Sequence, residues 1–124
     1  MPIATARDAA DLLAPLFAAA EGEKLVILYL DSARRMIEVE EHRAAFADEA
    51  ALPLRAIFAA ALRHDAAGLV IAHNHPSGNP EPSRADIDAT RRLAALAAPL
   101  GILLHDHLIF AGGDCRSFRE LGLL

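Results

Sequence analysis

The chain has 124 residues, of which 54% are hydrophobic and 23% charged, and its net charge is −5 at pH 7. This length suits one folded domain covering residues 1–124, and the composition excludes a disordered protein. The basic residues are scattered through an acidic chain, so we expect no direct nucleic-acid binding. The only cysteine, Cys115, excludes an internal disulfide and any zinc site built on paired cysteines.

The first residues give no signal for export or membrane insertion. Asp8, Asp11 and Pro15 interrupt the apolar residues there, so neither a signal peptide nor a membrane span of about 20 residues fits. We therefore expect a cytoplasmic protein without membrane contact. The sequence carries no signal for oligomeric state.

Three elements are predicted in the first part of the chain. Apolar residues recur at helical spacing from 5 to about 20, with Thr5 as a suitable N-cap. The short apolar run at 25–30 predicts a buried strand. Residues 36–42 alternate between apolar and charged, which predicts a half-exposed strand paired with the first one as a hairpin.

Helices and buried strands alternate in the second part. The spacing predicts a helix from residue 53 to about 62, a buried strand at 69–72, a helix from 83 to about 99 and a strand at 102–110. The Pro- and Gly-rich segment 74–82 is a loop, because its prolines cannot sustain a helix or a sheet. This order predicts the α/β class: an α/β sandwich in which helices flank a mixed β-sheet.

Two details of the later elements are also predicted. The third helix should turn a small set of apolar residues inward, namely Ile87, Leu93, Leu96 and Ala97. After the last long strand, Gly112 and Gly113 should turn the chain toward a short helix at 117–121.

Three residues that can bind a metal ion lie around the loop. His73 and His75 are two positions apart at the end of a predicted strand, so their side chains point to the same face. Asp86 falls in the first turn of the next helix, where the helix dipole favours a carboxylate. Two imidazoles and one carboxylate leave a fourth tetrahedral position open, which is typical of catalytic zinc.

Each half of this pattern has a simpler explanation. A His-x-His pair alone is also found as two histidines on a surface loop. Ser83 and Asp86 match a capping box, in which the serine caps a helix and the acidic residue bonds back to the cap. The two explanations of Asp86 differ in burial, because a capping box can lie in solvent whereas a metal ligand must face a cleft.

The complete spacing is more specific than either half. The chain resembles the JAB/JAMM (MPN+) metalloprotease superfamily. It matches the signature of that superfamily with His73 and His75, a gap of seven residues, Ser83, two further residues and Asp86. The stretch 73–86 looks like the RadC-like branch in particular. Further similar segments are Leu30-Asp31, Pro53-Leu54-Arg55-Ala56-Ile57-Phe58, Asp106-His107 and Ser117-Phe118-Arg119-Glu120-Leu121-Gly122.

The resemblance implies a fold, a metal and an activity. The fold would be the JAB/MPN, cytidine-deaminase-like α/β sandwich. One zinc ion would be held by His73, His75 and Asp86, and zinc-activated water would hydrolyse a peptide or isopeptide amide bond in a peptide or protein substrate. The alternative is a catalytically silent MPN-type protein-interaction module associated with DNA repair.

Two further catalytic roles are implied in the same way. Glu23 lies just ahead of the first strand, where the resemblance places the superfamily's general base; the alternative is that Glu23 and Glu21 are solvated acids. Ser83 would support the oxyanion, a contribution of roughly 3 to 4 kcal/mol, although its one hydroxyl would then serve both capping and catalysis.

A second His-x-His pair lies in the last long strand. No Ser-x-x-Asp follows His105 and His107, so they are not expected to bind the metal. His107 is instead expected to make a buried hydrogen bond that supports the site.

The chain is expected to differ from the RadC-like branch at two places. We expect one helix rather than a helix-hairpin-helix region before its first strand, and residues 40–46 lack the usual Gly-Thr pair.

Overall fold

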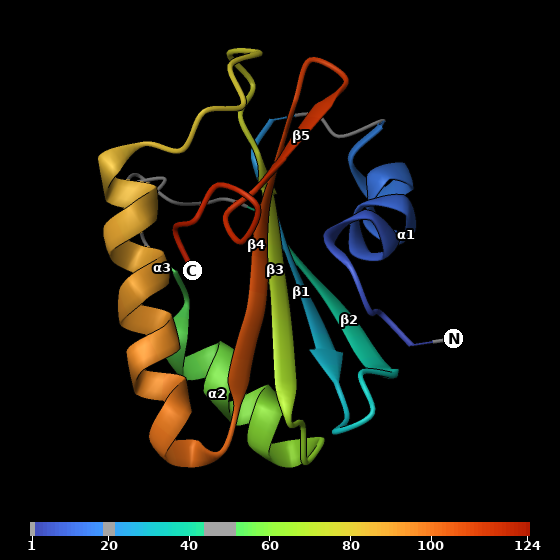
Figure 1. Ribbon diagram of the computed structural model, residues 1–124, viewed down its shortest axis with the longest axis vertical. Coiled ribbons are helices and arrows are strands. Elements are labelled where there is room, and N and C mark those ends of the chain that lie inside the picture. The colour runs from blue at the N-terminus through green and yellow to red at the C-terminus, as the bar shows by residue number, and fades with distance from the viewer. Residues whose placement is uncertain (1, 19–21, 44–51) are drawn as a thin grey trace.

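A mixed five-stranded sheet forms the centre of the computed structural model, which describes residues 2–18, 22–43 and 52–124 (Figure 1). The strand order is β2-β1-β3-β4-β5. β3 and β4 are parallel, and the other neighbours are antiparallel, including the predicted hairpin of β1 and β2. The strands are β1 (Lys24–Leu30), β2 (Met36–Arg43), β3 (Gly68–Asn74), β4 (Leu103–Ala111) and β5 (Asp114–Ser117).

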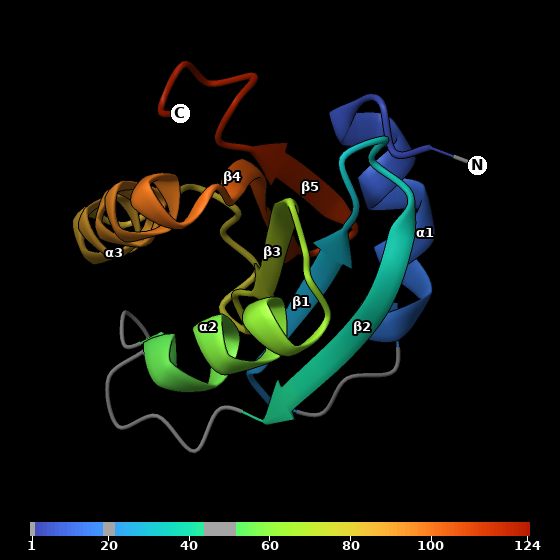
Figure 2. The ribbon, with the colours of Figure 1, turned by 90° about the horizontal axis from the view of Figure 1, so that it is seen from below.

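Helices cover both faces of this sheet. Helix α1 (Ala6–Ala18) packs on one face, whereas α2 (Leu54–Arg63) and α3 (Arg84–Ala97) pack on the other, with a 3-10 turn at Ala98–Leu100 (Figure 2). This arrangement confirms the predicted α/β sandwich. Positions 19 and 20 of the first predicted helix lie outside the described residues. Within the described ranges, no helix is long and apolar enough to cross a membrane.

The central strands are apolar on both faces because each face is covered. In β1, Leu25, Ile27 and Tyr29 pack toward α2 and α3, as part of one buried cluster. The intervening Val26 and Leu28 pack toward α1 in a second cluster. Strands buried on both faces show continuous apolar runs rather than alternation, which explains the pattern seen in the sequence.

Two predicted details are wrong. Residues 117–121 do not form a helix: β5 ends at Ser117, and turns follow it. Leu96 does not face inward, because its exposed fraction is 44%. The buried stripe of α3 instead contains Asp86, Thr90, Leu93 and Ala97, at spacings of four, three and four residues. Apolar residues alone could not locate a stripe that is half polar.

A β-bulge in β4 decides which residues face α3. Leu69 pairs with Leu104 but Val70 pairs with Asp106, so His105 is the extra residue. Beyond the bulge, each side chain of β4 points to the opposite sheet face from the one that regular alternation would give. Leu104 lies in the cluster under α2 and α3, and His107, three residues later, contacts α3 as well.

Gly68 provides the space for the bulged side chain. A Cβ atom at this position would lie 2.3 Å from Nε2 of His105, so any larger residue would collide with the ring. Leu108 then packs toward α1, and Asp106 is turned to that same side of the sheet. The bulge thus directs His107, rather than Asp106, toward the end of β3.

Candidate metal site

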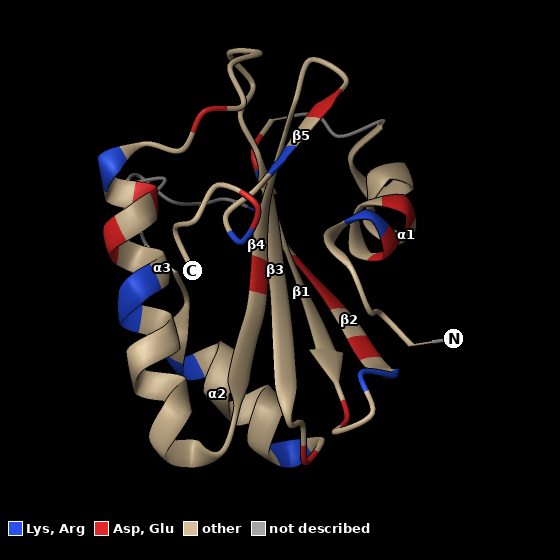
Figure 3. Cartoon of the chain, viewed as in Figure 1, with Lys and Arg blue, Asp and Glu red and all other residues tan. Residues whose placement is uncertain are grey.

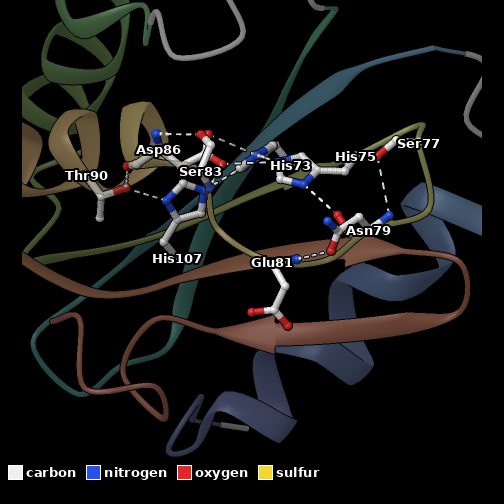
Figure 4. A network of polar contacts seen from close by, with 9 residues as sticks. All are labelled: His73, His75, Ser77, Asn79, Glu81, Ser83, Asp86, Thr90 and His107. Carbon is white, nitrogen blue, oxygen red and sulfur yellow. Dashed lines mark hydrogen bonds and ion pairs between the residues drawn. The ribbon is translucent and has the colours of Figure 1, made fainter.

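Three side chains converge at the end of β3 (Figure 4). His73 and His75 point to the same face, and Asp86 reaches them from the first turn of α3. The Nε2 atoms of the two histidines are 2.9 Å apart, and Asp86 Oδ2 lies 3.2 Å from His75 Nε2. The ligand atoms of all three residues lie within 4.8 Å of one another, so this cluster could hold a metal ion.

Asp86 also takes part in capping α3, whose N-cap residue is Ser83. Its backbone N–H donates to Ser83 Oγ at 3.0 Å, and its Oδ2 accepts from the Ser83 backbone N–H at 2.9 Å, which completes a capping box. Asp86 is nevertheless only 2% exposed and faces both imidazoles. The two explanations offered by the sequence are therefore compatible: the capping box holds the carboxylate in place beside the histidines.

The proton positions of His73 follow from a chain of hydrogen bonds behind it. Thr90 Oγ1 donates to the Asp86 carbonyl at 2.6 Å, so it accepts from His107 Nδ1, also at 2.6 Å. His107 Nε2 then carries a lone pair and accepts from His73 Nδ1 at 2.7 Å. This network assigns the proton of neutral His73 to Nδ1 and leaves the Nε2 lone pair directed at the cluster.

His75 is oriented in the same way by the loop. Its Nδ1 lies 2.8 Å from the backbone carbonyl of Asn79, which can only accept a hydrogen bond. Nδ1 of His75 therefore carries the proton, and the Nε2 lone pair of the neutral ring faces His73 and Asp86. The loop between β3 and α3 thus has a structural role in presenting this ligand.

Burial keeps His73 and His107 neutral. Desolvation lowers the pKa of His73 to about 4, even though Asp86 raises it, and His75 lowers it further. Desolvation also lowers the pKa of His107 well below its usual value, with His73 and His75 acting in the same direction. The contact of 3.5 Å between His73 Nε2 and Asp86 Oδ1 is therefore not an ion pair at neutral pH.

The convergence leaves an electrostatic imbalance. Two nitrogen lone pairs and a carboxylate face one another at hydrogen-bond distance, and they repel unless a positive charge lies among them. Imidazole nitrogens and a carboxylate are donors that suit a divalent transition metal. The described residues therefore fit a bound metal ion.

Asn74 connects the cluster to the start of β1. Its Oδ1 accepts from the Lys24 backbone N–H at 2.7 Å, and its Nδ2 donates to the Gly22 carbonyl at 2.9 Å. Glu23 lies between these two anchored residues and is half-buried. Leu25, two residues later, pairs with His73. The backbone of Glu23 is thus fixed beside the strand end that carries the histidines; Glu21 lies outside the described residues.

Two residues of this network were not predicted from the sequence. Thr90 is four residues after Asp86 and so lies on the same face of α3, a spacing that could have indicated it. Asn74 lies between the two histidines, and its role depends on a contact with β1 that no local pattern shows. The predicted buried hydrogen bond of His107 is present in the structure.

The sequence model of the RadC-like JAB domain matches residues 3–123. The chain belongs to this family. Among curated relatives of this RadC-like JAB domain, a UPF0758 protein of Salinibacter ruber is 37% identical over 124 residues, which is 100% of this chain and 53% of that protein. A UPF0758 protein of Bordetella petrii is 45% identical over 102 residues, covering 82% of this chain and 45% of its own length.

A UPF0758 protein of Rhodobacter capsulatus shows similar coverage. It is 41% identical over 102 residues, which is 82% of this chain and 48% of that protein. This RadC-like JAB domain therefore spans about half the length of the curated relatives it matches.

Proposed function

We propose that the protein is a zinc-dependent hydrolase that cleaves a peptide or isopeptide amide bond. One observation carries the proposal. Hydrogen bonds hold Nδ1 of His73 and Nδ1 of His75. Both Nε2 atoms therefore present lone pairs to the Asp86 carboxylate. A helix cap or a pair of loop histidines does not require this arrangement, whereas a metal ion with an open coordination position does.

His73, His75 and Asp86 would hold one zinc ion. Zinc bonds to imidazole nitrogen at about 2.0–2.1 Å, so two ligands at a tetrahedral angle would be separated by about 3.3 Å, close to the 2.9 Å between the Nε2 atoms. When bound, zinc acts as a Lewis acid that activates water at neutral pH. Three protein ligands leave one tetrahedral position for substrate or water.

Glu23 is proposed to act as general base and acid. It precedes β1 by one residue, and the alternation of that strand puts it on the same sheet face as Leu25, which is the face of His73. The carboxylate would take a proton from the attacking water and return one to the leaving amine. Support for this role comes from the anchoring of residues 22 and 24 by Asn74.

Ser83 is proposed to stabilise the oxyanion. Its Oγ accepts the Asp86 N–H through one lone pair, which leaves its own O–H proton free to donate. Capping and oxyanion stabilisation therefore use opposite properties of the hydroxyl group. One hydroxyl group could therefore serve both roles, and the cap would fix the Oγ position before substrate binds.

The alternative of a catalytically silent interaction module is less well supported by the site. A module without turnover needs neither a complete set of ligands nor a buried chain through His107 and Thr90 that fixes their protonation. A buried polar network of this kind costs desolvation energy that simple apolar packing would avoid.

A cleavage assay with matched variants tests the proposal. A library of fluorogenic peptides and isopeptides would be incubated with zinc-loaded wild-type protein, Glu23→Gln and, as a control of the same chemical change, Glu38→Gln on the exposed strand β2. We expect cleavage by the wild type and Glu38→Gln, and a loss of at least about 100-fold in Glu23→Gln. Equal background in all three proteins would favour the silent module.

A further inference from the structure

A cavity adjoins the metal site through His75, on the side of the sheet covered by α1. It has a volume of about 540 Å³ and is bounded by α1, by the end of β3 and by the hairpin between β4 and β5. This volume is within the usual range for a ligand pocket, about 300–1,000 Å³. His75 belongs both to the cavity wall and to the metal cluster, so the two share one residue at the end of β3.

The walls of the cavity are largely apolar. The rings of Phe17 and Phe110 stack at 4.8 Å between centroids, and Ala14 contributes a methyl group from α1. Gly112 and Gly113 line the hairpin side without adding side chains, and both adopt positive φ values that favour glycine. The result is an open, unobstructed pocket rather than a packed core.

The charge at the cavity is negative. Asp11 on α1 and Asp114 on β5 both line it, and no lysine or arginine is among the described residues that do so. Figure 3 shows acidic residues on these two elements. Asp11 has only a 3.9 Å contact with Arg7 in which both side chains are largely exposed, and no ion pair of Asp114 occurs within the described ranges. Both carboxylates are available to a cationic ligand.

The C-terminal end of α1 already interacts with one cationic side chain of the protein, that of Lys24. Lys24 Nζ lies 5.9 Å from the Phe17 ring centroid and donates to the Leu16 carbonyl at 2.6 Å. Aromatic faces and the last carbonyls of a helix both attract positive charge. Lys24 is also paired with Glu41, so its own charge is compensated. The cavity therefore combines an apolar wall for an aliphatic stem with acidic groups for a charged end.

Given the proposed hydrolase function, on which this inference rests, we propose that the cavity binds a lysine or arginine side chain of the peptide substrate close to the scissile amide bond. The methylene groups of such a side chain lie against Phe17, Phe110 and Ala14. Its cationic group interacts with Asp11 and Asp114. An acidic side chain is excluded by these carboxylates, and a neutral aliphatic one gains only the contact with the walls.

Binding and cleavage are measured separately so that the two proposals can fail independently. A fluorescein-labelled positional hexapeptide library would carry lysine, norleucine or glutamate at each position in turn. Affinity would be measured by fluorescence anisotropy with the full chain carrying Glu23→Gln, which limits cleavage. Hydrolysis of the same peptides would be measured with the zinc-loaded wild type. Norleucine has the aliphatic stem of lysine without its charge, so it isolates the contribution of the carboxylates.

Two pairs of variants locate the binding site. Asp114→Asn removes one carboxylate from the cavity, and Asp88→Asn makes the same change on an exposed part of α3. Ala14→Trp fills the cavity from an exposed position of α1, and Ala95→Trp makes the same change on an exposed position of α3. Circular dichroism would establish that each variant is folded before its affinity is compared.

At one library position we expect lysine to bind about tenfold more tightly than norleucine, and glutamate to bind more weakly than either. Asp114→Asn and Ala14→Trp should reduce the preference for lysine several-fold, while both α3 controls retain it. A lysine preference without any cleavage would support the pocket and contradict the hydrolase. Cleavage with equal affinity for lysine and norleucine, or a preference unchanged by Asp114→Asn, would overturn the pocket and leave the hydrolase standing.

Discussion

The Nδ1 atom of His73 lies 2.7 Å from Nε2 of His107, and this contact determines which nitrogen of His73 faces the metal site. His107 can accept this hydrogen bond because its own proton is directed to Thr90. A side chain on β4, 34 residues away in sequence, thus sets the protonation of a candidate ligand on β3.

Replacing His107 should weaken metal binding without unfolding the protein. His107→Phe keeps an aromatic ring stacked on Phe118 but removes the acceptor for His73 Nδ1–H. The proton of His73 is then no longer held away from the site, and we expect zinc affinity to fall about 10- to 100-fold in a chelator competition titration. His105→Asn is the control, since His105 contacts none of the three candidate ligands, and its affinity should match the wild type. A wild-type affinity in His107→Phe would show that this hydrogen bond does not orient His73.

Ser83 should show separable effects on stability and activity. Ser83→Ala removes the N-cap of α3 and should lower the free energy of unfolding by about 1 kcal/mol. Ser83→Gly also lacks the hydroxyl and brings no other donor, but glycine is tolerated as an N-cap, so its stability should fall by only a few tenths of a kcal/mol. Both variants should lose about 100-fold in kcat, as measured on the best peptide of the cleavage screen. Full activity in Ser83→Gly would exclude the oxyanion role.

The stability of the metal-free protein should fall with decreasing pH. Folded His73 stays neutral until its pKa of about 4, whereas the unfolded chain binds this proton near 6.5. Between these values the unfolded state binds more protons, so the free energy of unfolding decreases as the pH falls, by up to about 3 kcal/mol from this residue. The lowered pKa of His107 acts in the same direction.

Urea unfolding in the presence of a chelator at pH 7.5 and 4.5 measures this effect. His73→Gln should be less sensitive to pH than the wild type, since it lacks the titrating ring. An equal loss of stability in both proteins would mean that His73 is not held neutral by burial.

The bulge in β4 should depend on the absence of a side chain at residue 68. Gly68→Ala places a Cβ atom 2.3 Å from His105 Nε2, so the ring must move, and we expect a loss of about 1–3 kcal/mol in the free energy of unfolding. His105→Ala in the same chain should recover most of this loss. A double-mutant cycle by chemical denaturation checks the coupling, and strictly additive effects would contradict the packing of His105 over Gly68.

The metal cluster could be predicted because its signals are local. His73 and His75 share a face through strand alternation, and Ser83 and Asp86 mark the start of a helix by their spacing. Both patterns involve residues close in sequence, where backbone geometry alone fixes the relative directions of side chains. The resemblance to the RadC-like family links the two halves across the loop.

The supporting contacts could not be predicted because they depend on sheet register. His107 faces α3 only because His105 bulges out of β4, and nothing in the sequence of that strand fixes the pairing with β3. Thr90 is a polar residue on a buried helix stripe, so a search for apolar periodicity passes over it. The sequence predicts no strand over β5 because its four residues show no alternation of apolar side chains.

Anomalous scattering at the zinc edge, from crystals of protein purified without added metal, would show whether His73, His75 and Asp86 hold a zinc ion. We predict one peak per chain, within about 2.0–2.2 Å of Nε2 of His73, Nε2 of His75 and a carboxylate oxygen of Asp86. The peak should be lost in His75→Ala, and the neighbouring density should show Glu23 directed toward the fourth coordination position. A protein that binds zinc elsewhere, or that shows no peak at these three residues even after zinc is added, would rule out the proposed zinc site.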